Sequence, residues 1–479
     1  MTEWQTKLTT SPTTLHVYLM GIGGAGLSAI ATVLLEMGVR VSGSDRQHSQ
    51  RTETLAAMGA QIFVPQVAEN FDHMSGGAGN LPDVVLMSSA IADDNAERQA
   101  AERLNIPVVK RSDFLPTLLH NRTVIAVAGT HGKSTTTSMI IQTLREAGIE
   151  AGYIVGTSLP TYGNANAGSS PYFVIEADEY DYMFLGTNPT IAVVTNVEWD
   201  HPDCFPKPAD FHNAFEQFVD LVPASGLVIS CMDDTGAEQL RTRGNTSQTV
   251  WMTYGTDKSA NLVAINPTAI AGQGYEAALQ VSGEDGNQGI LRLHVPGLHN
   301  LRNAMAAYLV AVHCGVLAED ACTSLSNFRG TARRFEHKGT RDGVTVIDDY
   351  AHHPSEIETT LAGASKQYPN QRIWAVFQPH TFSRTKNMVT EMASSFDSAD
   401  QVLVLDIYAA REIDDGSIHA SDIVAASHHT AIHHVPSFES AVEVLCSETT
   451  EGDVIITLGA GDGYLVGELF LSAKESIAG

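Results

Sequence analysis

The chain has 479 residues, of which 43% are hydrophobic and 17% are charged, as in ordinary soluble globular proteins. This length exceeds what one hydrophobic core usually organises and indicates about three domains, at roughly 150 residues each. The 28 basic and 55 acidic residues leave a formal charge of -27, which repels nucleic acid and anionic membranes, so we expect neither as a partner.

Cysteine usage and the lack of long apolar runs favour a cytoplasmic location. The five cysteines lie far apart, and no pair has the CxxC spacing of zinc or dithiol sites. Residues 1–14 are polar and lack the apolar core of a signal peptide, and no segment reaches the ~18 consecutive apolar residues of a membrane span. We therefore expect reduced thiols in a cytoplasmic protein.

The first predicted unit alternates short apolar runs with stretches of helical period, the pattern of βα units around a parallel sheet. It is predicted to contain strands at 16–22, 39–42 and 84–87 and a helix at 26–37. Gly38 ends that helix. The unit is expected to close near Arg122.

A second unit begins at Thr123, where a buried strand leads into a glycine loop and a helix over 134–147. Further strands are predicted at 172–175 and 191–195, with a loop of Gly, Ser and Asn at 160–171. Residues 223–295 carry shorter alternating runs that indicate added strands, whose pairing stays open. A boundary is expected near Phe328, and later strands are predicted at 344–347, 373–377, 402–405 and 454–458.

The sequence Gly129-Thr130-His131-Gly132-Lys133-Ser134 has the strand and helix neighbours of a nucleotide phosphate loop. Lys133 is expected to reach the β and γ phosphates and Ser134 to place its hydroxyl on Mg²⁺. Thr135 to Thr137 fall in the first helical turn, where their hydroxyls could satisfy unpaired amides. Val127 stands where the common spacing has a glycine, so the loop is a shorter variant.

A second glycine loop lies near the start of the chain, where Gly21-Ile-Gly23-Gly24-Ala-Gly26 matches G-x-G-x-x-G. Asp45 follows at about the separation of a ribose-binding acid. The motif indicates a ligand with a pyrophosphate and a ribose, and it does not separate NAD, as in a dehydrogenase, from another diphosphate.

Polar clusters follow several of the predicted strands. Glu176 in Glu-Ala-Asp-Glu-Tyr-Asp follows one strand, and His201 in Asn-Val-Glu-Trp-Asp-His follows the next, so both are candidate metal ligands. Asp348-Asp349-Tyr-Ala-His-His follows a third, and we rank a zinc site there low because cysteine or carboxylate ligands at metal spacing are missing. Arg333-Arg334 is a cation pair suited to phosphate charge.

Seven segments together resemble the Mur ligase family in order and across nearly the whole chain: GTHGKS, EADEYD, NVEWDH, PGLHNLRN, FRGTARRFE, DDYAHHP and FQPHTFSRT. The resemblance implies an α/β protein of three domains. These are a Rossmann-like domain for a UDP-sugar (1–121), a central phosphate-loop ATPase with a mostly parallel sheet (122–328) and a Rossmann-like domain that receives an amino acid (329–479). GIGGAGLS and DDYAHHP are most similar to the members that join L-alanine to UDP-N-acetylmuramate with ATP and Mg²⁺. The alternative is a sibling that adds a preformed peptide to the same UDP-sugar.

The resemblance also implies residue roles, and it assigns the first glycine loop to UDP rather than NAD. The UDP-sugar residues are Gly21, Gly23, Gly24, Gly26, Ser44, Asp45, Ser88 and Ser89. The ATP residues are Gly129 to Thr135, Asn300, Asn303, Arg334 and Asp349, and the catalytic set is Lys133, Glu176, His201 and Arg334. The residues expected to bind Mg²⁺ are Ser134, Glu176 and His201. Those expected to bind the amino acid are Tyr350, His352 and Arg384, although Thr381 stands where some relatives carry arginine. We expect a monomer or a weak dimer.

Overall fold

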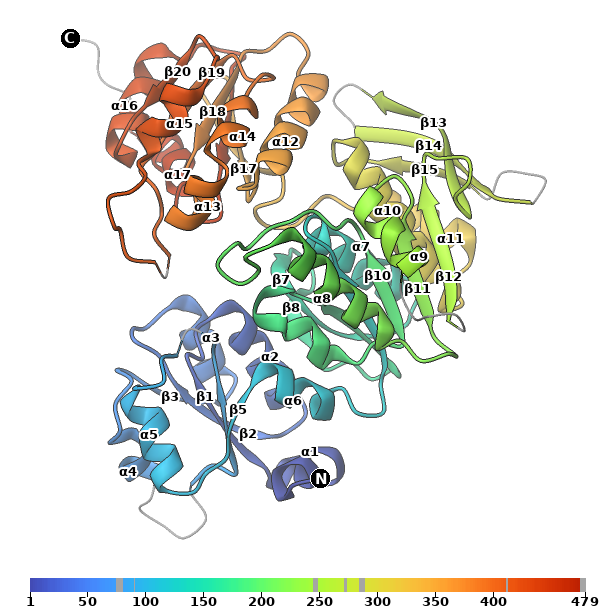
Figure 1. Cartoon of the computed structure of the whole chain (residues 1–479), viewed down its shortest axis with the longest axis vertical. Helices are drawn as coiled ribbons and strands as arrows, with labels where there is room; N and C mark the ends of the chain where they lie inside the picture. Colours follow the sequence, from blue (N-terminus) through green and yellow to red (C-terminus); the bar gives the residue numbers. More distant parts are fainter. Residues whose placement is uncertain are drawn as a thin grey trace. The chain divides into compact units, whose positions relative to one another are not determined.

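The computed structural model describes residues 1–74, 81–89, 91–243, 249–270, 274–283, 289–410 and 412–473 (Figure 1). The chain forms two compact units. The first contains Met1–Glu198, Ala209–Tyr254 and Leu309–Val316, and the second contains Trp199–Pro208, Gly255–Tyr308 and Leu317–Gly479. Among the residues described, none of the helices combines the length and apolar character needed to cross a membrane.

A five-stranded parallel sheet opens the first unit, in the order β3-β2-β1-β4-β5. Its strands are β1 (His16–Met20), β2 (Arg40–Ser44), β3 (Gln61–Phe63), β4 (Val84–Met87) and β5 (Val108–Lys110). The helices are α1 (Glu3–Thr10), η1 (Pro12–Thr14), α2 (Ala25–Glu36), α3 (Gln50–Ala57), α4 (Asn70–Met74), α5 (Ala96–Arg103) and α6 (Arg111–Leu118). Tyr18 and Met20 of β1 pack against Phe71 and Met74 of α4. The strands and helix predicted here are confirmed to within a few residues.

A second run of strands in the first unit has the order β12-β11-β10-β6-β9-β7-β8. These strands are β6 (Thr123–Ala128), β7 (Gly152–Leu159), β8 (Gly163–Asn166), β9 (Tyr172–Glu176), β10 (Ile191–Val194), β11 (Leu227–Cys231) and β12 (Val250–Gly255). The helices are α7 (Lys133–Glu146), η2 (Tyr180–Thr187), α8 (Pro208–Asp220) and α9 (Thr235–Arg243). Neighbouring strands from β12 to β7 run parallel, and β8 pairs antiparallel with β7.

The prediction of a loop over 160–171 was wrong in part, because β8 lies inside it. This strand is polar, with the sequence Gly-Asn-Ala-Asn, and it takes the edge of the sheet, where backbone pairing does not require apolar alternation. The strands expected over 223–295 are present, together with helix α9, which was not foreseen. Three of them form an antiparallel meander in the second unit: β13 (Leu262–Ile270), β14 (Gly274–Val281) and β15 (Gly289–Leu293).

The second unit also holds a six-stranded sheet in the order β16-β17-β21-β18-β19-β20. Its strands are β16 (Glu336–Arg341), β17 (Val344–Asp349), β18 (Ile373–Phe377), β19 (Gln401–Val404), β20 (Ile432–His434) and β21 (Val454–Leu458). The helices that accompany it are α12 (Pro354–Gln367), α13 (Phe382–Asn387), α14 (Val389–Ser394), α15 (Ala420–Ala426), α16 (Phe438–Glu448) and α17 (Tyr464–Ser472), and the chain also forms α10 (Leu298–His313) and α11 (Ala318–Asn327) before them (Figure 1).

Alternate residues of this sheet face two separate cores. Ile456 and Ala375 point to the core shared with α12, α14 and α15, whereas Ile455 and Trp374 point to the core shared with α16 and α17. Helices on both faces of a mainly parallel sheet make this a Rossmann-like, doubly wound fold. In such sheets ligands bind beyond the carboxyl ends of the strands, which is where the predicted site residues of this unit begin.

Candidate active site

The loop after β6 adopts a backbone that only glycine takes without strain. Gly129 has a φ of +140°, and a Cβ on it would lie 1.9 Å from the Oγ1 of Thr195. Gly132 has a φ of +79° and occupies the N-cap of α7, which has no side-chain cap and no acid in its first turn. The first amides of α7 are therefore left for another acceptor, as in nucleotide phosphate loops.

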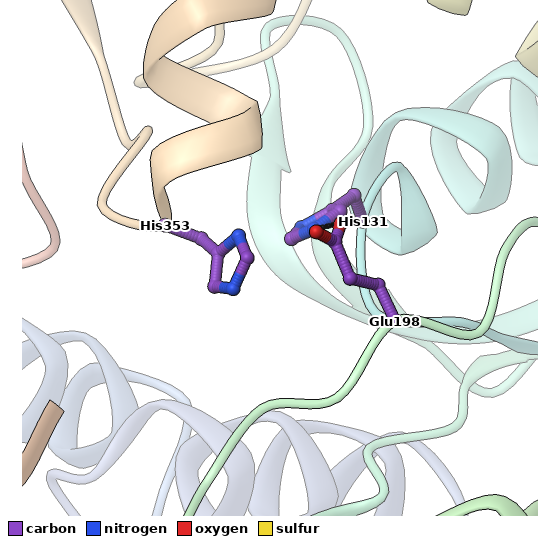
Figure 2. Close-up of side chains that lie close together, drawn as sticks. All are labelled: His131, Glu198 and His353. Atoms are coloured by element: carbon purple, nitrogen blue, oxygen red, sulfur yellow. Dashed lines mark hydrogen bonds and ion pairs between the residues drawn. The ribbon is translucent and has the colours of Figure 1, made fainter. Parts of the chain in front are cut away.

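Residues that follow β10 form hydrogen bonds with the loop after β6. The Thr195 hydroxyl donates to the His131 carbonyl at 2.6 Å, and the His131 amide donates to Oδ1 of Asn196 at 2.8 Å. The Thr130 hydroxyl donates to the Glu198 carbonyl at 2.7 Å. Figure 2 shows His131 beside Glu198, where the imidazole Nε2 and carboxylate Oε2 are 3.0 Å apart. Asn196 and Glu198 thus define the loop, although the sequence singled out only their neighbour His201.

Lys133 is largely buried and meets a carboxylate that sequence reasoning passed over. Its Nζ donates to both oxygens of Glu179, at 2.9 and 3.1 Å, and to the carbonyls of Gly129 and Thr130, at 2.5 and 3.1 Å. Burial by itself would lower the pKa of Lys133, but the charges of Glu179, Asp178 and Glu176 outweigh it and raise the pKa above the ordinary value of 10.5. Lys133 is therefore a permanent cation within the loop.

Glu176 lies beside the loop, as its place at the end of β9 predicted. The Ser134 hydroxyl donates to Oε1 of Glu176 at 2.9 Å, and the Gly156 amide donates to Oε2 at 2.7 Å. The hydroxyls of Thr136 and Thr137 were expected to satisfy helix amides, and this is wrong. Both are buried without a hydrogen-bond partner in the described structure, because the helix turns them inward and the Thr136 amide already donates to Gly132.

The first glycine loop closes on its own acid. The Gly23 amide donates to Oδ2 of Asp45 at 2.8 Å, so the expected ribose ligand already binds the loop backbone. Gly21, at a φ of +82°, and Ile22 donate their amides to the Ser44 carbonyl. The Ser44 hydroxyl is buried and donates to Glu97, so in this structure it faces the core rather than a ligand.

The remaining members of this predicted set lie at the same edge of the sheet. Gly24 is the N-cap of α2, and Gly26 is in the first turn of that helix. Ser88 and Ser89 directly follow β4, the parallel neighbour of β1. The carboxyl ends of three adjacent strands therefore carry all eight residues assigned to the UDP-sugar.

In the second unit the end of β17 organises the two arginines. Oδ2 of Asp349 accepts from the Phe335 amide and Oδ1 from the Ala351 amide, both at 2.8 Å. Burial raises the pKa of Asp349 to about 6, and the Arg334 charge and the two amides counter only part of that rise. Arg334 lies over the ring of Tyr350, with its Cζ 5.1 Å from the ring centroid.

Arg333 contacts the other side of this arrangement. Its Nε donates to Asp348 at 3.0 Å, its Nη2 donates to the Gly459 carbonyl at 2.7 Å, and its guanidinium lies over the rings of Tyr350 and Tyr464.

The two asparagines expected near adenine form hydrogen bonds with residues close to them in the sequence. Asn303 donates to Oδ1 of Asn300 at 3.2 Å, Asn300 donates to the Pro296 carbonyl at 2.7 Å, and both side chains are buried.

A small pocket of the second unit contains Arg384, one of the three residues assigned to the amino acid, whereas Tyr350 and His352 do not line it. It is lined by His201, Pro202, Asp203, His380, Thr381, Ser383 and Arg384. Arg384 forms a two-pronged ion pair with Asp200, at 3.1 and 3.2 Å, and donates to Nδ1 of His380 at 3.1 Å. The ring of His380 packs edge to face against that of His352.

Burial and neighbouring charges set the pKa values of Asp200 and His352. Burial alone would raise the pKa of Asp200, but Arg384 and His201 hold it well below its usual range. Burial, and then the charge of Arg384, hold the pKa of His352 well below its usual value. Asp200 is thus a permanent anion and His352 a neutral imidazole at neutral pH. Neither Asp200 nor His380 was named from the sequence, although both stand within the quoted motifs NVEWDH and FQPHTFSRT.

Known proteins resemble this chain over nearly its whole length. Models of the Mur ligase family catalytic domain, the Mur ligase middle domain and the Mur ligase glutamate ligase domain match residues 16–123, 127–311 and 333–461. A UDP-N-acetylmuramate–L-alanine ligase of Caldanaerobacter subterraneus is 41% identical over 96% of this chain and 98% of its own length. The chain belongs to the Mur ligase family.

Other Mur ligases agree with this membership. A UDP-N-acetylmuramate–L-alanine ligase of Renibacterium salmoninarum is 40% identical over 97% of both chains. The solved UDP-N-acetylmuramate–alanine ligase of Thermotoga maritima has a TM-score of 0.79 at 28% identity, covering 95% of this chain and 98% of its own. A murein peptide ligase from Psychrobacter arcticus has a TM-score of 0.72 at 25% identity, covering 97% of this chain and all of its own.

Proposed function

We propose that this Mur ligase uses ATP to join L-alanine to the lactyl carboxylate of UDP-N-acetylmuramate, giving UDP-N-acetylmuramoyl-L-alanine, ADP and phosphate. The observation that carries the proposal is the identity of about 40% over nearly the full length to ligases named for this reaction. The alternative, addition of a preformed peptide to the same sugar, has support from the solved peptide ligase, which is less similar.

The first step of the proposed reaction transfers the γ-phosphoryl group of ATP to the lactyl carboxylate. A lactyl carboxylate oxygen attacks the γ-phosphorus of ATP, the bond to the β-phosphate oxygen breaks, and ADP leaves with that electron pair. The product is an acyl phosphate, whose carbon is a good acyl donor. Such phosphoryl transfer needs mainly positioning and charge stabilisation. We assign these to the amides of the Gly129 to Thr135 loop, Lys133 and Arg334.

The second step forms the amide. The neutral amine of alanine attacks the acyl carbon, the tetrahedral intermediate collapses, and phosphate departs with the electron pair of its C–O bond. The proton lost by the amine nitrogen passes to the departing phosphate. We assign Tyr350, His352 and Arg384 to the amino acid, and Asn300, Asn303 and Asp349 to the nucleoside of ATP. Since Arg384 is already paired with Asp200, its contact with alanine would share that charge.

The donor set beside the phosphate loop suits Mg²⁺. The Ser134 hydroxyl and the Glu176 carboxylate are hard oxygen donors 2.9 Å apart, next to the amide-rich loop. We assign both to the metal and add His201 by resemblance. When bound, Mg²⁺ would neutralise phosphate charge, which a chain with a formal charge of -27 needs locally.

The UDP-sugar belongs at the first glycine loop in this proposal. Its diphosphate would take the amides at the start of α2, with Ser88 and Ser89 nearby and Asp45 at the ribose. The three domains are proposed to span residues 1–121, 122–328 and 329–479. We also propose that the protein is cytoplasmic and is a monomer or a weak dimer.

One assay tests the function and its alternative together. Purified protein is supplied with ATP, Mg²⁺ and UDP-N-acetylmuramate, and phosphate release is measured across L-alanine, glycine, L-serine and a panel of muropeptide stem peptides. We expect release that requires the UDP-sugar and is fastest with L-alanine, with the amide product seen by mass spectrometry. Faster release with a peptide would establish the alternative. Release that does not depend on the UDP-sugar would overturn both.

A further inference from the structure

Helix α2 begins without the usual means of satisfying its first amides. Its N-cap is Gly24, which has no side chain to accept a hydrogen bond, and its first turn contains no acid. The first intrahelical bond recorded at this end is from the Ser28 amide to the Gly24 carbonyl. The amides of residues 25–27 therefore face outward at the positive end of the helix dipole.

An arginine that follows the edge strand β5 lies against the first turn of α2. Arg111 directly follows β5, and β5 and β1 both run parallel to β4, so their carboxyl ends share one edge. A Cβ on Gly26 would lie 2.5 Å from Nη1 and 3.5 Å from Cζ of Arg111. The guanidinium therefore packs against the bare backbone of the first turn of α2.

The Arg111 guanidinium at the N-terminus of α2 is electrostatically unfavourable unless one anion binds both the guanidinium and the helix amides. A cation is repelled by a helix N-terminus, where acids and phosphates are favoured. Within the described residues no carboxylate pairs with Arg111, whereas its neighbour Lys110 pairs with Asp181 at 3.2 Å. An anion at this point would neutralise the guanidinium and accept from the free amides at once.

We propose that Arg111 is a further substrate-binding residue that contacts the diphosphate of the UDP-sugar. The inference rests on the proposed function and extends it. The loop carries no lysine or arginine between Gly21 and Gly26. Arg51 of α3 donates to the Gly23 carbonyl at 3.5 Å, and Arg111 adds a cation beside Gly26, at the first turn of α2. The planar fork of arginine also fits two phosphate oxygens in a way that lysine does not.

The test measures binding of UDP-N-acetylmuramate by titration calorimetry to the full-length protein, without ATP. We expect R111Q to raise the Kd roughly tenfold to a hundredfold and R111K to raise it less, since a hydrogen bond to a charged group is lost or weakened. R103Q is the matched control, because Arg103 is an exposed arginine of the same domain, and it should change the Kd by less than about twofold.

A second comparison ties the effect to the phosphates. By NMR titration, R111Q should bind uridine as the wild type does and bind UDP more weakly. Equal UDP affinity for wild type and R111Q would overturn the inference while leaving the proposed function intact. If R111Q fails to fold, a wild-type Kd for R111K would overturn it equally. Failure of the wild type to bind the UDP-sugar would instead count against the proposed function.

Discussion

The two glycine loops of the first unit share a backbone plan and differ in the origin of their charge. Each follows a buried strand of a parallel sheet and leads into a helix with a glycine N-cap, Gly24 in one and Gly132 in the other. The second loop contains its own cation, Lys133, set among carboxylates. The first contains none and is covered by Arg111. In both loops a glycine N-cap leaves helix amides without a side-chain acceptor. Under the proposed function, the placement of the cation and the acids decides whether such a loop serves chemistry or only binding.

The sharpest test of this difference is Lys133→Ala. Loss of the loop's cation should lower phosphate release by on the order of 10² to 10³ or abolish it, because charge stabilisation of the transferring phosphate is lost. Affinity for UDP-N-acetylmuramate should stay within about twofold, since the first loop is untouched. Lys366→Ala removes the same charge from an exposed position on α12 and serves as the control. Undiminished turnover in K133A would rule out the assignment of this loop to ATP.

Gly129→Ala should be the most destabilising change in either loop. The φ of +140° is strained for alanine, and the new Cβ would lie 1.9 Å from the Thr195 hydroxyl, which itself bonds the loop. We expect a loss of roughly 3 kcal/mol or more in the free energy of unfolding, measured with denaturant.

Gly148→Ala provides the control for backbone strain alone. Gly148 also has a positive φ, of +81°, but a Cβ there meets nothing within 4 Å. It should cost about 1 kcal/mol. Equal losses in the two variants would show that close contact with β10 does not constrain the phosphate loop.

Sequence reasoning located both loops because strand, glycines and helix are contiguous. It placed Glu176 correctly beside the phosphate loop for a similar reason, since a residue that follows a parallel strand must emerge at the ligand edge. It missed Arg111 and Glu179, whose roles depend on which strands become neighbours and how a short 3-10 segment turns. It also missed β8, because a polar edge strand is specified by its partner rather than by apolar alternation.

Gly26→Ala tests whether Arg111 belongs to the first loop. The added Cβ would meet the flexible end of the Arg111 side chain rather than backbone, so the fold should remain and the arginine should move. We expect the KM for the UDP-sugar to rise about tenfold with kcat little changed. The double variant G26A/R111Q should be hardly worse than R111Q alone, because both changes remove one interaction. Additive losses would separate Gly26 from Arg111.

Glu179→Gln should have the smallest effect at neutral pH and a larger one in alkali. The raised pKa of Lys133 means that stabilisation by its carboxylates is fully present below the ordinary value of 10.5 and is lost as the pH rises through the higher folded value. Removing the charge of Glu179 lowers that folded value, so the alkaline decline of kcat/KM for ATP should begin at lower pH. At neutral pH we expect a change of about threefold to tenfold in the KM for ATP. The first glycine loop contains no lysine, so the pH dependence of UDP-sugar binding in alkali should be the same in E179Q and wild type. If E179Q shifted the alkaline decline of both ATP use and UDP-sugar binding, the two loops would titrate as one site.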